Sequence, residues 1–278
     1  MNKKLIALDA GHGMVTAGKR CLQSLDPNQT REWWLNDRIM DQVQSLLATY
    51  DCQVLRVDDT TGAKDISLSA RVKAANSAKA NIYISMHHNA GLNGRSGGGT
   101  VVYYSSNKLE RAVQAQKLYN AIIHRTGLSG NRSEKVVKKG FYVIAHTTMP
   151  AFLVENGFMD SPTDVPVILS DQHAARTAVA VVEFLVDALQ LKKVQTVSGS
   201  QSPAGTTVEG STADSAYYPA YTGKKTTLSA AMTSLRLNST YAYRKKIASA
   251  NGIQGYMGTA AQNTLMYNLL VAGRLKRA

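Results

Sequence analysis

The sequence predicts an α/β fold, in which a largely parallel sheet has helices on both faces, followed by a small, mainly helical C-terminal domain. Two observations support this prediction. Apolar runs of strand length alternate with segments of helical periodicity over the first two thirds of the chain. Near residue 194 the composition then changes to Ser, Thr, Gly and Ala, and only short helical patterns follow.

The elements of the first part follow from local patterns. Apolar runs bounded by turn residues predict strands at 4–10, 53–57, 81–85, 100–105, 140–145 and 151–158. Apolar residues three and four positions apart predict helices at 31–50, 67–80, 108–126 and 171–191. Ser67 is the expected cap of the second helix. Because strands and helices alternate, we expect parallel strands that are buried on both faces.

The domain boundaries follow from the change in composition. We expect a first domain at 1–193, a flexible linker at 194–216 and a second domain at 217–278, since the linker has no hydrophobic periodicity. Helical patterns in the second domain lie at 227–237, 239–251 and 259–273.

The positive charge is concentrated in the tail. The chain has a net charge of +13, and residues 194–278 hold nine Lys and Arg against two Asp and Glu. A basic tail suggests a polyanionic partner, although surplus lysine can also serve solubility alone. The sequence has no aromatic ribonucleoprotein motif, zinc-finger spacing or clear recognition helix, so we expect no nucleic-acid partner.

The cysteines and the N-terminal residues indicate the compartment in which the protein is made. Cys21 and Cys52 form no CxxC motif and no disulfide framework, which favours synthesis in a reducing compartment. The first apolar run ends at Asp9, too early for a signal peptide or a transmembrane segment. We therefore expect a protein made in the cytoplasm without a signal peptide. The oligomeric state is left open.

Candidate functional side chains gather where strands end. His12 follows the first strand, His87 and His88 follow the third, Glu155 lies in the run 151–158, and Glu32 lies near a helix start. Ligands bind at the carboxyl ends of parallel strands, and a catalytic zinc ion takes three His or carboxylate ligands. A carboxylate in an apolar run is costly to bury without a partner or a function.

Each candidate also has a structural alternative. A lone histidine at a strand end is most often a hydrogen-bonded structural residue, and we interpret His124, His146 and His173 in that way. The glycines that flank His12 favour a functional role for it, since they leave its imidazole unobstructed. Cys21 is a weak alternative zinc ligand.

Five motifs, taken together, resemble a known enzyme family. The stretches "LIALDAGHG", "EWWLN", "SLSARVKAANSAKANIYISMHHNA", "GGTVVYY" and "MPAFLVENGFMDSPTD" occur in this order over about residues 4–191. Their order and spacing resemble the zinc-dependent N-acetylmuramoyl-L-alanine amidases of the AmiC/CwlV type, the third amidase family. About twenty positions separate His12 from Glu32, somewhat more than is usual in that family.

The resemblance implies a site, a cofactor and a substrate. His12, Glu32 and His87 become ligands of one Zn²⁺, and Glu155 becomes the catalytic carboxylate. The implied reaction is hydrolysis of the amide between the lactyl group of N-acetylmuramic acid and L-alanine in peptidoglycan. Other zinc peptidase chemistry, on a different amide, is an open alternative.

The residues around this site have weaker assignments. Asp9 could orient an imidazole N–H, and Asn89 could hold the substrate backbone or form a turn. Neighbouring side chains in a strand point in opposite directions, so His88 is expected at the rim or in packing, where alanine is tolerated.

The tail resembles the short C-terminal wall-binding segments of lysins from Bacillus and clostridial phages. This implies an anionic wall polymer or peptidoglycan as its partner. The candidate contacts are Tyr241, Tyr243, Arg244, Lys245 and Lys246. The whole chain then resembles a phage or prophage endolysin of a Gram-positive host that reaches the wall after release by a holin. The alternatives are a host autolysin or sporulation amidase, and a non-catalytic protein that binds anionic polymers.

Overall fold

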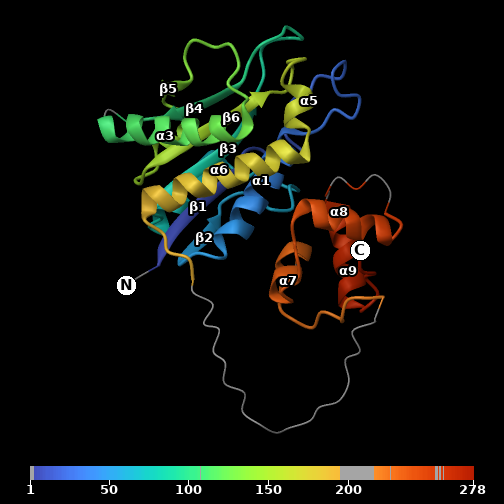
Figure 1. Cartoon of the computed structure of the whole chain (residues 1–278). Helices are drawn as coiled ribbons and strands as arrows, with labels where there is room; N and C mark the ends of the chain where they lie inside the picture. The colour runs from blue at the N-terminus through green and yellow to red at the C-terminus, as the bar shows by residue number, and fades with distance from the viewer. Residues whose placement is uncertain are drawn as a thin grey trace. The chain divides into compact units, whose positions relative to one another are not determined.

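The structure, a computed structural model, consists of two compact units, Met1–Lys192 and Lys193–Ala278 (Figure 1). It describes residues 3–106, 108–194, 216–225, 227–253, 256, 258 and 260–278. Of the linker predicted at 194–216, residues 195–215 lie outside the described residues.

A six-stranded sheet in the order β2-β1-β3-β6-β4-β5 forms the centre of the first unit (Figure 1). The strands are β1 Lys4–Ala10, β2 Cys52–Arg56, β3 Ile82–Asn89, β4 Thr100–Tyr104, β5 Val136–Lys138 and β6 Ala151–Phe158. Every pairing is parallel except that of β4 with β6. The predicted, largely parallel sheet is confirmed.

Helices cover both faces of the sheet, as predicted. The helices of this unit are α1 Glu32–Leu47, α2 Leu68–Ser77, α3 Leu109–Thr126, α4 Tyr142–Ala145, α5 Val165–Ile168 and α6 Asp171–Leu189. Residues of α1, α3 and α6 pack on one face, and residues of α2 and α4 pack on the other. Ser67 caps α2 by accepting a hydrogen bond from the Ala70 amide.

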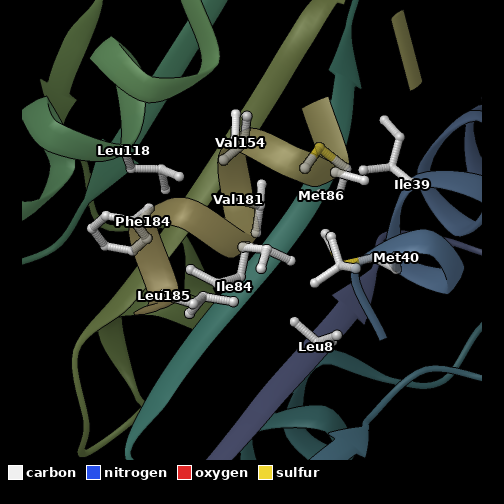
Figure 2. Packing of buried hydrophobic residues seen from close by; sticks show 14 of the residues in the cluster. Leu8, Ile39, Met40, Ile84, Met86, Leu118, Val154, Val181, Phe184 and Leu185 are labelled. Carbon is white, nitrogen blue, oxygen red and sulfur yellow. The ribbon is translucent and has the colours of Figure 1, made fainter. Parts of the chain in front are cut away.

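The larger core lies between the sheet and the helices α1, α3 and α6. Alternate strand residues point into it, because successive side chains of a strand face opposite sides. Figure 2 shows strand residues meeting side chains of three helices: Leu8, Ile84, Met86 and Val154 face Ile39 and Met40 of α1, Leu118 of α3, and Val181, Phe184 and Leu185 of α6. These side chains are almost fully buried, so this packing fixes the positions of the strand ends.

One predicted strand is wrong. Residues 140–145 contain the single helical turn α4 instead, and the strand in this region is the three-residue β5 just before it. Val143 and Ile144 of α4 are buried against the second face of the sheet. Burial of these two side chains therefore outweighs the strand propensity of a β-branched pair.

The described part of the second unit contains three helices, as predicted: α7 Leu228–Ser234, α8 Tyr241–Ala250 and α9 Ala260–Val271. Thr227 caps α7 and Thr240 caps α8 through their hydroxyl oxygens. Met232, Ile247, Leu270 and other apolar side chains are buried in this unit. Among the described helices of the whole chain, none combines the length and apolar character needed to cross a membrane.

Candidate active site

Three of the predicted site residues meet at the carboxyl edge of the sheet. The parallel strands β1, β3 and β6 are neighbours and end at the same edge. His12 follows β1, while His87 and Glu155 are directly paired residues of β3 and β6. Strand register therefore places an imidazole and a carboxylate side by side.

The Gly11–His12 turn is fitted to His87. A Cβ atom on Gly11 would lie 2.0 Å from Cε1 of His87, so a larger residue here would collide with that imidazole. His12 itself has a φ of 68°, in the left-handed region that few non-glycine residues adopt. The backbone thus accepts local strain to turn His12 toward His87, and their rings lie edge to face with centroids 4.9 Å apart.

The long loop before α1 positions Glu32 beside His12 and His87. The Glu32 amide donates to the Lys19 carbonyl at 3.0 Å, and the Cys21 amide donates to the Thr30 carbonyl at 2.9 Å. The loop is thereby folded back on itself, and its extra length does not displace Glu32. Cys21 is buried among apolar side chains, which raises the pKa of its thiol to about 12, and it is not part of the group formed by His12, Glu32 and His87.

The three predicted ligands form a compact group. Glu32 Oε1 lies 3.3 Å from His12 Nε2 and 3.0 Å from His87 Nδ1, and all three ligand atoms lie within 4.8 Å of one another. Burial alone would raise the pKa of Glu32, but hydrogen bonds with the two imidazoles lower it overall. Burial would lower the pKa of His87, but its contact with Glu32 raises it. The Glu32 carboxylate is therefore ionised, and one nitrogen of each imidazole lies within hydrogen-bond distance of it.

This group fits a divalent metal ion. Ligand atoms around a tetrahedral zinc ion lie about 3.3 Å apart, given bonds of about 2.0–2.1 Å, and the two measured spacings are close to that value. The other oxygen of Glu32, Oε2, is buried without a hydrogen-bond partner and has only Lys19 Nζ at 3.7 Å. Two imidazole nitrogens and one carboxylate are the donor set of a catalytic zinc site.

Glu155 has the properties of a proton acceptor. Its Oε2 atom is buried and has no hydrogen-bond partner in the described structure. Burial raises the pKa of Glu155 to about 7, and the charge of Glu32 adds to this, while His87, Lys19 and Lys139 act in the opposite direction. A carboxyl group with such a pKa can take up and release a proton near neutral pH.

A glycine-rich segment before β4 is held by two carboxylates of the turn after β6. The Asp160 carboxylate accepts hydrogen bonds from the amides of Gly91 and Asn93 at 2.8 and 2.7 Å. Asp164 accepts from the amide of Gly99 at 2.7 Å. A Cβ atom on Gly98 would lie 2.4 Å from the Asp164 carboxylate, so this approach requires glycine. The turn after β6 therefore holds the segment that enters β4.

Asp9 does not have the predicted role. Its buried carboxylate is paired with Arg71 and accepts hydrogen bonds from the Tyr83 hydroxyl at 2.8 Å and Ser85 Oγ at 2.7 Å. Among the described residues no histidine is its hydrogen-bond partner, so the expectation that it orients an imidazole is wrong. Asn89 Oδ1 accepts a hydrogen bond from the next amide, Ala90, which is the turn-forming alternative.

Arg71 joins α2 to the His12 loop. Besides Asp9, its guanidinium donates to the carbonyls of Ala10 at 2.8 Å and His12 at 2.9 Å. We expect Arg71→Met to lower the free energy of unfolding by about 3–5 kcal/mol, because it leaves a buried carboxylate without its cation. Urea denaturation measures this. Lys73→Met, an exposed change on the same helix, is the control and should cost less than about 0.5 kcal/mol.

His88 is not at the rim. It is 2% exposed, and its Nδ1 hydrogen-bonds Asn36 Oδ1 at 2.8 Å. Asn36 Nδ2 donates in turn to the Gly11 carbonyl at 3.1 Å. Asn36 therefore links the strand that carries His87 to the turn that carries His12. Because the pair is fully buried, the pKa of His88 lies well below its usual value.

The expected tolerance of His88→Ala is revised accordingly. The change removes a buried ring and leaves Asn36 Oδ1 without its donor, so we expect a loss of about 2–4 kcal/mol of stability. Denaturant unfolding measures it, with the exposed His124→Ala as control. Equal stability of the two variants would contradict a structural role for His88.

A second buried histidine makes the stability pH-dependent. Asn156 Nδ2 donates to His173 Nε2 at 3.0 Å, which requires a neutral ring nitrogen as acceptor. Burial, helped by the nearby charges of Arg38 and Arg176, lowers the pKa of His173 to about 4.

Below its ordinary pKa of about 6.5, His173 binds a proton more readily in the unfolded chain than in the folded one. Its contribution is therefore present at pH 7 and is lost as pH falls toward 4, by about 3 kcal/mol. We expect the unfolding free energy of His173→Gln to depend less on pH in this window. Denaturant unfolding of both proteins at several pH values measures the difference; parallel curves would contradict the assignment.

The candidate wall contacts in the tail divide into two groups. Lys245 and Lys246 are exposed and Tyr243 is partly exposed. Tyr241 and Arg244 are only 7% and 4% exposed. Arg244 donates to the Ser239 carbonyl and to the Tyr256 hydroxyl inside the unit. The prediction that Tyr241 and Arg244 contact a wall polymer directly is therefore wrong, because they form the core of this unit.

Three residues of the site escaped the sequence argument: Lys19, Asn36 and Arg71. Asn36 is four positions after Glu32 on α1, so helical periodicity alone places both on one face toward the site. That signal was available in the motif "EWWLN". Lys19 and Arg71 reach the site through loop and helix packing, for which the sequence contains no local signal.

Comparison with known proteins agrees with this geometry. The N-acetylmuramoyl-L-alanine amidase family (Amidase_3) matches residues 6–187. An endolysin of Bacillus phage SPP1 is 30% identical over 202 residues, which cover 72% of this chain and 70% of that protein.

Two solved structures share the fold at 25% identity. An N-acetylmuramoyl-L-alanine amidase from Clostridium difficile 630 has a TM-score of 0.61 and matches over 68% of this chain and 98% of its own. The catalytic domain of CwlV, from Bacillus (Paenibacillus) polymyxa var. colistinus, has a TM-score of 0.59 over 68% and 99%. Because the family match spans well over half of the chain and includes all four residues of the site, the chain belongs to the N-acetylmuramoyl-L-alanine amidase family.

Proposed function

We propose that this chain is a zinc-dependent peptidoglycan hydrolase that cleaves the amide between the lactyl group of N-acetylmuramic acid and L-alanine. One observation carries the proposal: three ligand atoms of His12, Glu32 and His87 lie within 4.8 Å of one another, beside the buried carboxyl group of Glu155. A binding protein without catalysis has no need for this arrangement.

The protein side chains have distinct roles in this proposal. The side chains of His12, Glu32 and His87 would hold the ion. When bound, zinc supplies a Lewis acid that polarises the scissile carbonyl and lowers the pKa of a water molecule to about 7. Glu155 accepts the proton of the attacking water at its unpartnered Oε2 and donates it to the amide nitrogen that leaves.

Product analysis tests the reaction. The protein is incubated with purified peptidoglycan, with and without a chelator, and the new termini are identified by mass spectrometry. We expect free L-alanine amino termini and intact glycan chains, and no release after chelation. Release that is insensitive to chelation, or termini from another amide, would overturn the proposal.

We further propose that the second unit binds the wall and that the protein acts as an endolysin. The support is the likeness to the phage endolysin and the excess of basic residues in the tail. A holin gene beside the coding sequence would support release of this kind in a phage or prophage, whereas a position among host wall-remodelling genes would favour an autolysin. Co-sedimentation of the full chain with purified walls tests wall binding, and a chain that stays in solution would contradict it.

A further inference from the structure

The part of the second unit from residue 216 onward contains no acidic side chain. Residues 216–278 hold nine Lys and Arg and no Asp or Glu. Arg244 is buried, and the other eight are exposed: Lys224, Lys225, Arg236, Lys245, Lys246, Arg274, Lys276 and Arg277. The basic side chains of residues 216–278 therefore have no acidic side chain within that stretch to neutralise them, and we expect this surface to attract anions.

Three segments of this unit meet around a pair of tyrosines. The Tyr218 amide donates to the Leu275 carbonyl at 2.8 Å, which joins the start of the unit to its C-terminal segment. The hydroxyls of Tyr218 and Tyr243 are 3.0 Å apart, which joins that start to α8. The guanidinium of Arg277 lies over the Tyr218 ring, 5.2 Å from its centroid.

Lys246 completes this cluster. It lies three positions after Tyr243 on α8, so both project from the same side of the helix. The end of α8 is also fixed to the C-terminal segment, because the Asn251 amide group hydrogen-bonds the backbone carbonyl and N–H of Lys276 at 3.1 and 2.9 Å. We call Tyr218, Tyr243, Lys246 and Arg277 the tyrosine-pair cluster.

The cluster contains hydrogen-bond donors and positive charges suited to phosphate oxygens. One hydroxyl of the tyrosine pair donates to the other, and the second hydroxyl has no acceptor among the described residues. Arg277 presents a planar fork of N–H groups and Lys246 a point charge; both bind phosphate oxygens well. The partly exposed ring of Tyr243 provides an apolar surface for the carbon atoms between successive phosphates, while Tyr218, which is only 3% exposed, supports the Tyr243 hydroxyl from inside the unit.

We propose that the tyrosine-pair cluster binds the phosphodiester groups of an anionic wall polymer. The proposal rests on the proposed wall binding of this unit and specifies its site and its ligand chemistry. It also selects among the exposed cations, since only those beside the tyrosine pair are expected to contribute strongly.

Two charge-matched variants of the full chain test it. Lys246→Gln with Arg277→Gln removes two charges from the cluster, and Lys224→Gln with Arg236→Gln removes two exposed charges from other segments of the same unit. Binding is measured by co-sedimentation with walls before and after hydrofluoric-acid extraction of phosphodiester polymers, with soluble poly(glycerol phosphate) as competitor. We expect at least about tenfold weaker binding for the first pair, from loss of two charge-assisted contacts, and a clearly smaller loss for the second.

The outcomes separate the two proposals. If both double variants lose the same binding affinity for walls, the cluster is not a specific site, and binding depends on the total positive charge of the unit. Undiminished binding to extracted walls would overturn the phosphate assignment while wall binding stands. Failure of the unaltered protein to bind either wall would overturn wall binding itself.

If circular dichroism shows that the first double variant is unfolded, Tyr243→Phe tests the cluster in its place. It keeps the ring and removes one hydroxyl, so it should fold and bind severalfold more weakly. Full binding by Tyr243→Phe would contradict a role for the tyrosine pair.

Discussion

Replacing Glu155 by Gln should reduce amide hydrolysis by about 10²–10⁴-fold while the protein still binds one zinc ion. The size of the loss is that of a positioned general base and acid. The amide of Gln has nearly the same shape as the carboxyl group but cannot accept a proton, and the ligands His12, Glu32 and His87 are untouched. Release of L-alanine amino termini measures the rate, and metal analysis of the purified protein measures zinc.

Glu110→Gln is the matched control for this change. Glu110 lies in the first turn of α3, and its side chain is 66% exposed. It should retain full activity. A Glu155→Gln enzyme that hydrolyses peptidoglycan as fast as this control would show that another group accepts the proton, and the assignment of Glu155 would be wrong.

Replacing His87 by Ala should abolish stoichiometric zinc binding and, with it, the activity. The two imidazole nitrogens converge on Glu32 Oε1, and removal of one nitrogen leaves two protein ligands, fewer than catalytic zinc sites use. Isothermal titration of the metal-free protein with zinc measures the affinity. This titration measures the loss of zinc binding independently of enzyme activity.

His124→Ala, on the exposed surface of α3, is the control and should bind zinc normally. The pair His87→Ala and His88→Ala then checks the register of β3. We expect the first to lose zinc and the second to lose stability. The reverse pattern would mean that the adjacent histidine is the ligand and that the strand is shifted by one residue.

The positions of the site residues were predictable because strand ends and turns have local signals. Apolar runs that end in Gly11 or in His87 mark the edge of the sheet, and a carboxylate inside "AFLVENGF" stands out among apolar neighbours. Partners distant in sequence give no such signal. The links from Arg71 to Asp9 and from Asn36 to His88 depend on which helix packs against which strand, which periodicity does not specify.

In the tail, too, the sequence predicts a helix but does not show which of its side chains are buried. The pattern "YAYRKK" identifies a helix with aromatic and basic residues, but not which of them face the core. Tyr241 and Arg244 lie one turn apart and are both buried, whereas Lys245 and Lys246 are exposed. Burial of an arginine runs against its usual exposure, and its hydrogen bonds to Ser239 and Tyr256 explain why it is stable there.

The glycine-rich segment before β4 also shows how two stretches that are distant in the sequence depend on each other. The amides of Gly91, Asn93 and Gly99 are held by two carboxylates, Asp160 and Asp164, which belong to the turn after β6. The proposed metal ligands and Glu155 lie outside the 91–99 segment. A change of either aspartate would therefore be felt at the entry of β4, a strand about sixty positions earlier in the sequence.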